Sequence, residues 1–335
     1  MAQIREEGDT TQEFSFKQLI FPFYVPSTLA FLGLGMLIPI LPLYAKSLGA
    51  NIAGATSIVG LYGMGNFIFN IPAGFLNAHF NKKYVLLGSV FFGAIFIALA
   101  AFTEAPWLLG VLLFLFGSAH TTFIITRLAI FRSIVPMQYR GRSLAILGGQ
   151  YRLGHFIGPI IGGFVAERLS FRMTLLLCSL LFGISFLIMI FSLSSSYSDE
   201  KRVEIKIRSF SNVGKILKEH YHIFSTAGIA IIILQLMRTA RQVIVPLMGE
   251  AKGLAVSQIG IVFGLIFLLE LLLFYPAGMI MDRWGRKVTA IPCFLFFALG
   301  FALLPVATGF ITLTLAALVT GIGNGVGSVL NMNLS

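Results

Sequence analysis

The chain has 335 residues, of which 57% are hydrophobic and only 11% are charged. A soluble domain carries about 25% charged residues, and several apolar runs here exceed the roughly 20 residues that a helix needs to cross a bilayer. The composition therefore excludes a soluble globular protein and predicts an all-α membrane protein with several spanning helices. The two cysteines, Cys178 and Cys293, lie in apolar runs, which favours buried thiols over a disulfide.

Ten apolar segments follow a polar N-terminal tail, residues 1–20. They lie at about 19–45, 54–77, 84–103, 107–131, 143–166, 172–194, 223–247, 257–280, 288–306 and 309–331. A polar and basic stretch, 195–222, separates the first six segments from the last four. We therefore predict a six-helix unit over 21–194, a central loop over 195–222 and a four-helix unit over 223–335.

Lysines and arginines are distributed unevenly over the loops between these segments. With the N-terminus inside, sixteen of the 24 lie on the inner side, namely Arg5, Lys17, Lys82, Lys83, Arg132, Arg140, Arg142, Lys201, Arg202, Lys206, Arg208, Lys215, Lys218, Arg283, Arg286 and Lys287. The outer side carries four, Lys46, Arg168, Arg172 and Lys252. This bias predicts a cytoplasmic N-terminus in a plasma membrane. It also explains the net charge of +11 without a nucleic-acid partner, because the basic loops face an anionic leaflet.

The second unit repeats the first at a constant offset of 204 residues. The overlay, which needs no gap, pairs Pro42 with Pro246, Gly49 with Gly253, Gly60 with Gly264, Pro72-Ala73-Gly74 with Pro276-Ala277-Gly278, and Gly117 with Gly321. Duplicated helical units are typical of secondary transporters, whose substrate site lies between the units near the bilayer midplane. The alternative is a chance similarity of two glycine-spaced apolar stretches.

The overlay ends with Ser335, which aligns with Phe131 near the end of the fourth segment. Nothing in the chain corresponds to residues 132–194, which hold the fifth and sixth segments. We therefore expect a twelve-helix protein that here lacks its last two helices. A natural ten-helix form is the alternative.

A charged loop follows the eighth segment on the inner side. Its residues Gly278, Asp282, Arg283, Gly285, Arg286 and Lys287 match the pattern G-x-x-x-D-R-x-G-R-K. This loop motif resembles the signature that the major facilitator superfamily carries between helices 2 and 3 and often again between helices 8 and 9. The resemblance implies a transporter fold of two pseudo-symmetric helical halves, with the motif as an inner latch in the outward-open state. A purely topological role for these charges is the alternative.

The first copy of the loop motif is less complete. It keeps Gly74, Lys82 and Lys83 but has Ala78 where the aspartate belongs. We therefore expect the inner latch to rest on Asp282 and Arg283, near Arg140-Gly141-Arg142 at the start of the fifth segment. The motif glycines are expected to let neighbouring helices approach closely.

The fifth segment carries a second motif, which we call the glycine motif. It comprises Gly154, Gly158, Pro159, Gly162 and Gly163 in the pattern G-x-x-x-G-P-x-x-G-G. It resembles the antiporter signature of the same superfamily, in which a bend at the proline seals and unseals the outer half-channel. Simple glycine-mediated helix packing is the alternative. An arginine common in the fourth helix of the family is Leu113 here, so proton coupling through that position is not supported.

The apolar segments contain a single acidic residue, Glu270. It lies about 18 Å along a helix from Asp282 at the inner end, close to the midplane. Its repeat counterpart is Asn66, so only one half has the acid. An intramembrane carboxylate indicates a proton carrier or a substrate contact. A structural ion pair with an arginine of the seventh segment and a place at the lipid edge are the alternatives.

Arg238 and Arg241 are three residues apart and share a face of the seventh segment. We predict that Glu270 pairs with one of them and that proton uptake breaks the pair. Arg152 lies equally deep in the fifth segment, with packing on carbonyls or on the latch as its alternative. Three deep arginines against one acid predict a basic cavity, which favours anionic or polar neutral substrates.

The fourth segment carries two further polar side chains, His120 and Arg127. His120 lies in the middle of the fourth segment, where it either titrates or bonds to a neighbour. Arg127 lies closer to the inner end and is expected to extend toward the headgroups.

No phosphate-binding loop, metal-ligand cluster or catalytic triad is present in the sequence. We therefore expect no enzyme, no cofactor and no metal. The predicted function is secondary active transport by alternating access, as proton-coupled efflux of a small organic compound by a monomer. The alternatives are an organic-anion exchanger or symporter, and a truncated membrane protein that does not transport.

Overall fold

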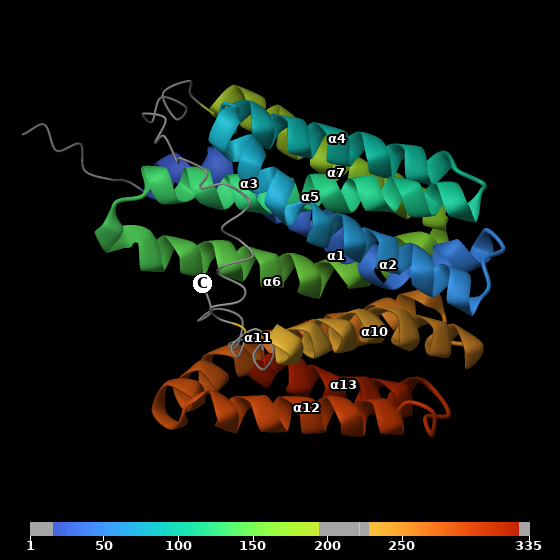
Figure 1. Ribbon diagram of the computed structural model, residues 1–335. Coiled ribbons are helices and arrows are strands. Elements are labelled where there is room, and N and C mark those ends of the chain that lie inside the picture. Colours follow the sequence, from blue (N-terminus) through green and yellow to red (C-terminus); the bar gives the residue numbers. More distant parts are fainter. Residues whose placement is uncertain (1–15, 194–220, 222–227, 328–335) are drawn as a thin grey trace, which may run out of the picture.

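The computed structural model describes residues 16–193, 221 and 228–327 (Figure 1). These residues form helices, turns and short loops, with no strand among them. The predicted N-terminal tail, 1–20, and central loop, 195–222, lie mostly outside the described residues.

Two groups of helices make up the described chain. The first consists of η1 (Phe16–Leu19), η2 (Ile20–Tyr24), α1 (Val25–Ser47), α2 (Ile52–Ile68), α3 (Asn70–His79), α4 (Lys82–Phe102), α5 (Pro106–Ile134), α6 (Met137–Arg168) and α7 (Phe171–Ser192). The second consists of α10 (Ile229–Ala251), α11 (Val256–Trp284), α12 (Arg286–Leu303) and α13 (Phe310–Gly327). Since η2 leads directly into α1 and α2 leads into α3, the described residues form six spans and then four, as predicted.

Eight of the described spans are long and apolar enough by themselves to cross a membrane. The other two, α6 and α12, run alongside them in the same bundle (Figure 1). Helix α6 is 32 residues long but carries Arg140, Arg142 and Arg152 and many glycines. The apolar part of α12 is short, Lys287–Leu303. Helix α12 is supported by the repeat, because it begins 204 residues after α4, whereas α6 has no counterpart in the second unit.

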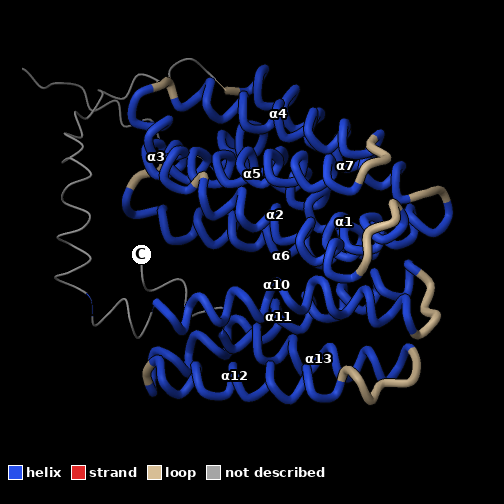
Figure 2. The backbone as a smooth tube through the Cα atoms, turned by 45° about the vertical axis from the view of Figure 1, so that its right-hand side comes forward, coloured by secondary structure: helices blue, strands red, loops and turns tan. Residues whose placement is uncertain are grey.

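The two groups lie one above the other in both views (Figures 1 and 2). Helix α6 of the first unit packs along α11 of the second, while α10 contacts α1 and α2. We call the side of the bundle with the α5–α6 and α11–α12 connections the basic side, since Arg140 and Lys287 lie there. It is at the left of Figure 1, and we call the opposite side the distal side.

The repeat seen in the sequence is also a repeat of structure. Helices α10, α11, α12 and α13 each begin 204 residues after α1, α2, α4 and α5. Gly49 and Gly253, which end the first helix of each unit, both have positive φ, 93° and 74°, a conformation that glycine adopts without strain. Helix α5 packs on α2 and α4 as α13 packs on α11 and α12. The two-half architecture is thus confirmed.

Polar side chains set several helix starts on both sides of the membrane. The side chain of Asn51 accepts from Gly54 N at 2.7 Å, that of Asn81 accepts from Lys83 N at 2.9 Å, and that of Ser170 accepts from Met173 N at 3.1 Å. Such N-caps satisfy backbone N–H groups that have no intrahelical acceptor. The short loops between the spans are fixed in this way.

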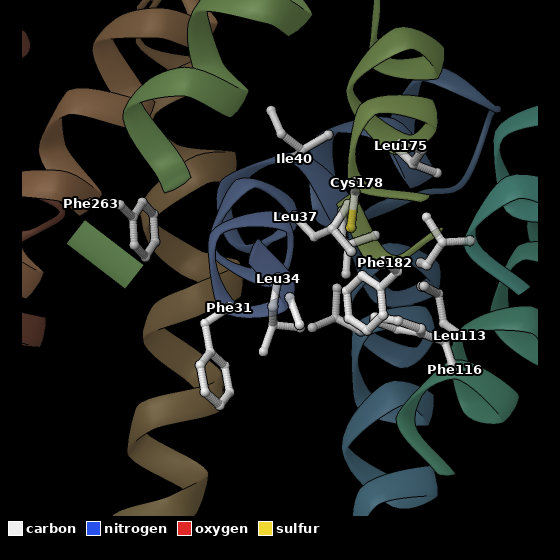
Figure 3. Close-up of a cluster of buried hydrophobic side chains, with 14 of the residues drawn as sticks. Phe31, Leu34, Leu37, Ile40, Leu113, Phe116, Leu175, Cys178, Phe182 and Phe263 are labelled. Carbon is white, nitrogen blue, oxygen red and sulfur yellow. The ribbon is translucent and has the colours of Figure 1, made fainter. Parts of the chain in front are cut away.

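The interior of the first unit is built around α1, which is enclosed by its neighbours (Figure 3). Its side chains Leu34 and Leu37 lie beside Phe116 of α5 and Phe182 of α7, and all four are nearly inaccessible. Phe116 and Phe182 meet edge to face with ring centroids 5.5 Å apart. Helix α1 is therefore the central element of the first unit, and α6 and α7 pack along it.

Candidate functional site

A cavity of about 680 Å³ lies between the two units. Its walls come from α1, α2, α5 and α6 of the first unit and from α10 of the second. The polar side chains that line it are Tyr62, Asn66, His120, Tyr151, His155, Gln235, Thr239 and Gln242, and the rest of the lining is apolar or glycine. No aspartate, glutamate, lysine or arginine is among the lining residues in the described part of the chain. Its position between repeated units is that of a transporter substrate site.

A buried ion pair lies in the second unit, at the depth of this cavity. Arg241 Nη1 of α10 donates to Glu270 Oε1 of α11 at 2.6 Å. Arg241 is 1% exposed and Glu270 is 9% exposed. The rings of Phe267 and Phe297 lie 5.8 and 5.9 Å from the guanidinium carbon. The structure thus pairs Glu270 with Arg241 rather than with Arg238, and in protein rather than at a lipid edge.

Arg238 has a different partner, a residue that the sequence alone did not single out. Its Nε donates to Oδ1 of Asn324, a buried residue of α13, at 2.6 Å. Asn324 lies 204 residues after His120, so the repeat offers a signal that would have found it. Arg238 and Arg241 together attach α10 to both α11 and α13.

The expectation of a basic cavity is wrong for the cavity described above. Helix α10 turns Gln235, Thr239 and Gln242 toward the cavity, whereas Arg238 and Arg241 point to the second unit's own helices. The arginines are held by neighbouring acceptors because a guanidinium without one is costly to bury. The cavity wall is left neutral.

Arg152 of α6 lies across the boundary between the units. Its guanidinium carbon is 3.4 Å from the ring centroid of Phe274 on α11, which is a close cation–π contact. One turn further, the ring of His155 lies 5.2 Å from Phe267, the same ring that neighbours Arg241. Helix α6 therefore touches the surroundings of the ion pair through aromatic rings.

His120 belongs to a polar cluster in the first unit. Its Nδ1 lies 3.2 Å from Asn66 Oδ1 and 3.1 Å from the Tyr62 hydroxyl. Asn66 and His120 are the repeat counterparts of Glu270 and Asn324. Equivalent positions thus hold a neutral cluster in one unit and a charged cluster in the other.

Arg127 of α5 does not extend to the headgroups, contrary to expectation. Its side chain is 6% exposed, and its guanidinium lies over the rings of Phe31 and Phe123, 4.8 and 5.4 Å from their centroids. Its Nε and Nη1 have no hydrogen-bond partner among the described residues. Contact with the aromatic faces compensates part of the cost of burial.

The predicted latch residues form no ion pair with the start of α6 among the described residues. Asp282 and Arg283 are exposed on the basic side, and Asp282 makes no ion pair within the described residues. Arg283 lies 5.8 Å from the ring of Trp284. Gly285 ends α11 with a φ of 85°, and Lys287 is exposed in α12, the helix that Arg286 begins.

Two glycines of the loop motif do not serve close helix approach here. A Cβ built on Gly74 or on Gly278 would meet nothing within 4 Å, so this expectation is wrong for the described arrangement. Of the first-copy lysines, Lys82 begins α4. Lys83 Nζ donates to the carbonyl of Leu193 at 2.5 Å, which satisfies the end of α7.

The glycine motif lies where α6 meets two helices at once. Gly154, Gly158 and Gly162 face α1, and a Cβ on Gly158 would lie 2.6 Å from the carbonyl oxygen of Leu32. Gly163 faces the other way, and its Cβ would lie 2.8 Å from the carbonyl oxygen of Val256 on α11. The carbonyl of Pro159 is in close contact with Gly260 of α11. Pro159 and Gly163 therefore contact the second unit toward the distal side, whereas the other three glycines pack α6 on α1 within the first unit.

Polar contacts join the units on the same side. Lys46 Nζ and Glu250 Oε2 form an exposed ion pair at 2.8 Å. Their positions are 204 residues apart, so equivalent residues of the two units meet, as occurs only on the axis that relates them. Glu167 Oε2 at the end of α6 accepts from Ser257 N in the first turn of α11 at 2.9 Å. The distal side is thus closed in this structure.

Comparisons with known proteins agree with this geometry. Residues 27–237 and 227–335 match the family model of the Major Facilitator Superfamily. An uncharacterized MFS-type transporter of Methanocaldococcus jannaschii is 23% identical over 319 residues, which are 94% of this chain and 82% of that protein. The class B tetracycline resistance protein of Escherichia coli is 26% identical over 303 residues, 87% of this chain and 74% of that protein.

Solved structures show the same fold. The nucleoside transporter NupG superposes with a TM-score of 0.74 at 16% identity, over 94% of this chain and 81% of that one. A bacterial homologue of the human lysosomal transporter Spinster, in an inward-facing and unoccupied conformation, gives 0.70 at 11% identity over 95% of this chain and 75% of that one. The family match, the repeated units and the cavity between them lead to one conclusion: the chain belongs to the Major Facilitator Superfamily and is an integral membrane transporter of small molecules.

Proposed function

We propose that the chain is a secondary active transporter that exports a small organic compound in exchange for protons by alternating access. The observation that carries this proposal is the buried Arg241–Glu270 pair beside the cavity. Acidic residues inside a membrane are costly and mark proton or substrate pathways. As the single acid of the described spans at this depth, Glu270 is our candidate for the proton carrier.

Protonation of Glu270 would replace an ion pair by a neutral acid and a cation. The buried Arg241 then loses its counter-charge, which is strongly unfavourable in this environment. Phe267 contacts both the Arg241 guanidinium and the ring of His155 on α6. A shift of Arg241 would therefore move rings that lie at the contact between the units. Proton uptake is in this way coupled to the packing of α6 on α11.

We propose that alternating access opens and closes the two ends of the contact between α6 and α11 in turn. Pro159 and Gly163 of the glycine motif, the Lys46–Glu250 pair and Glu167 join the units on the distal side in the present structure. In the opposite state these contacts part, and Asp282 closes against the start of α6. With the basic loops in the cytoplasm, as the charge bias predicts, the present structure has its distal side closed toward the outside.

The direction of transport is supported by a relative whose name records drug resistance. The tetracycline resistance protein matches most of this chain, and export is the route by which a transporter confers resistance on its cell. A buried acid beside a cavity without charged lining favours proton exchange over anion exchange.

Substrate counterflow and pH-driven uptake in proteoliposomes test this function. A panel of labelled small organic compounds that includes tetracycline is screened with and without a pH gradient. We expect the gradient to drive accumulation in the wild type, and Glu270→Gln to lower that accumulation at least about tenfold while counterflow stays within about twofold. Glutamine keeps an acceptor for Arg241 but carries no proton.

The control is Glu104→Gln, an exposed acid in the loop between α4 and α5. It is expected to behave as the wild type. Wild-type transport that ignores the pH gradient would reject the proton role and favour an anion exchanger instead.

A further inference from the structure

The Nε2 atom of His120 is buried and has no hydrogen-bond partner among the described residues. His120 is 8% exposed and lines the cavity, and its Nε2 makes no hydrogen bond in the described structure. Its ring is roughly parallel to those of Tyr62 and Phe116, with centroids 6.1 and 6.3 Å away. Both of these rings line the same cavity. A buried polar atom in a cavity wall is a place where a ligand can make a hydrogen bond that nothing else satisfies.

The hydrogen bonds around the ring determine what Nε2 can do. The amide of Asn66 is oriented by its Nδ2, which donates to the carbonyl of Tyr62 at 3.0 Å. Its Oδ1 therefore faces Nδ1 of His120, and it also accepts from the hydroxyl of Thr121 at 3.0 Å. Asn66 Oδ1 only accepts, and the Tyr62 hydroxyl at 3.1 Å can accept as well as donate, so the tautomer with the hydrogen on Nδ1 satisfies both contacts. In the neutral ring Nε2 is then a lone-pair acceptor.

The remaining lining defines the rest of the ligand. Opposite His120, α10 offers the uncharged groups of Gln235, Thr239 and Gln242. Apart from Asn66 and two glycines, the other walls are aliphatic or aromatic, and none of the lining residues that the structure describes is an acid, a lysine or an arginine. A charged ligand would lose its hydration there without meeting a counter-charge. A flat apolar ligand would lie against the rings of Tyr62 and Phe116.

We infer that the cavity binds an uncharged, flat, amphipathic molecule that donates an O–H or N–H hydrogen bond to Nε2 of His120. This rests on the proposed transport function and names the substrate class for it. His120 is then a specificity-determining residue, since a compound that lacks the donor leaves the buried acceptor unpaired. A site that hydrogen-bonds its ligand in this way discriminates strongly against the analogue without the group.

Binding of a matched pair of probes tests the inference. Naphthol and its methyl ether have the same ring system, but only naphthol donates a hydrogen bond. Equilibrium dialysis against the purified chain in detergent gives the affinity for each, and the ratio of the two is compared between variants. We expect the wild type to bind naphthol about tenfold more tightly than the ether.

Three variants complete the design. His120→Leu removes the acceptor and is expected to bind both probes equally, with an unchanged affinity for the ether. His120→Gln places an amide oxygen near the site of Nε2 and is expected to keep part of the preference. His79→Leu, the same change at an exposed histidine of α3 outside the cavity, should match the wild type. Gel filtration confirms that each variant is folded.

Several results would overturn the inference. They are equal affinities of the wild type for the two probes, the absence of saturable binding of either, and a naphthol preference that survives in His120→Leu. The affinities of the wild type for naphthol and for its methyl ether test the inference even if His120→Leu does not fold. Since dialysis needs no gradient, these results are separate from failure of the proton-coupled function, which is read from the pH dependence of transport.

Discussion

Residues 66, 120, 270 and 324 occupy equivalent places in the two units but have different chemistry. The first unit has Asn66 and His120, which bond to each other and line the cavity. The second has Glu270 and Asn324, which bond to two arginines of α10 instead. The duplicated unit thus places these side chains at equivalent positions, and the differences in residue type give the two positions different chemistry. We assign recognition to the neutral pair and coupling to the charged one.

Removing one partner of the Arg241–Glu270 pair should cost more stability than the intact pair contributes over an apolar replacement. Arg241→Met or Glu270→Met alone leaves one buried charge, and we expect each to lower the free energy of unfolding by about 3–5 kcal/mol. The double variant is expected to recover most of that loss, because an apolar pair needs no partner. Unfolding of the purified protein in mixed micelles measures all three.

The exposed pair provides the control for this comparison. Lys46→Met removes one partner of an ion pair whose side chains are about two-fifths exposed, 41% and 42%. Solvent screens such a pair, so the expected change is only about 0–1 kcal/mol. Single variants at Arg241 and Glu270 that are as stable as Lys46→Met would contradict the buried role.

Helix α6 packs on α1 of its own unit and on α11 of the second unit, and its glycines are not equally close to these neighbours. A Cβ on Gly158 would lie 2.6 Å from the Leu32 carbonyl oxygen, whereas one on Gly149 would meet nothing within 4 Å. A glycine-to-alanine change at each of these two positions of α6 therefore separates the effect of packing from the effect of helix propensity.

Gly158→Ala is expected to destabilise the protein by about 1–3 kcal/mol, because backbone atoms of α1 cannot move aside easily. Gly149→Ala should instead be neutral or stabilising by up to about 1 kcal/mol, since alanine favours the helix. The midpoints of thermal unfolding of the two variants, compared with the wild type, give the sign. Equal effects at the two positions would show that the glycine motif does not act through this contact.

At the element scale the sequence predicts where helices lie better than how they face. The spans, their repeat and the polar loops follow from apolar runs and spaced glycines. The face of α10 that carries Gln235 could not be told from the face that carries Arg238, because lipid and protein interior are equally apolar and neither marks a side. The partnership of Arg238 with Asn324, and the open space around Gly278, depend on packing between distant segments and were missed for that reason.

The whole molecule is described with its distal side closed, so a restraint on that side should hold it there. We expect that a short thiol-to-thiol crosslinker applied to the double variant Lys46→Cys and Glu250→Cys abolishes counterflow, and that a cleavable version regains it on reduction. The native thiols, Cys178 and Cys293, are buried and should react little. The physical reason is that alternating access requires the two units to part at this point.

The single variant Lys46→Cys, treated in the same way, should retain counterflow. Full transport by the crosslinked double variant would mean that the units need not separate at Lys46 and Glu250. The distal contact would then be incidental to the transport cycle.

The Lys46–Glu250 pair also indicates an order of events in the evolution of the repeat. Two identical copies of one helical unit would have placed the same residue on both sides of this contact, and two identical side chains cannot form an ion pair. Attraction became possible only after the copies had drifted apart in sequence. The ion pair between Lys46 and Glu250 therefore arose after the duplication. A protein rebuilt from two identical units would lack this ion pair.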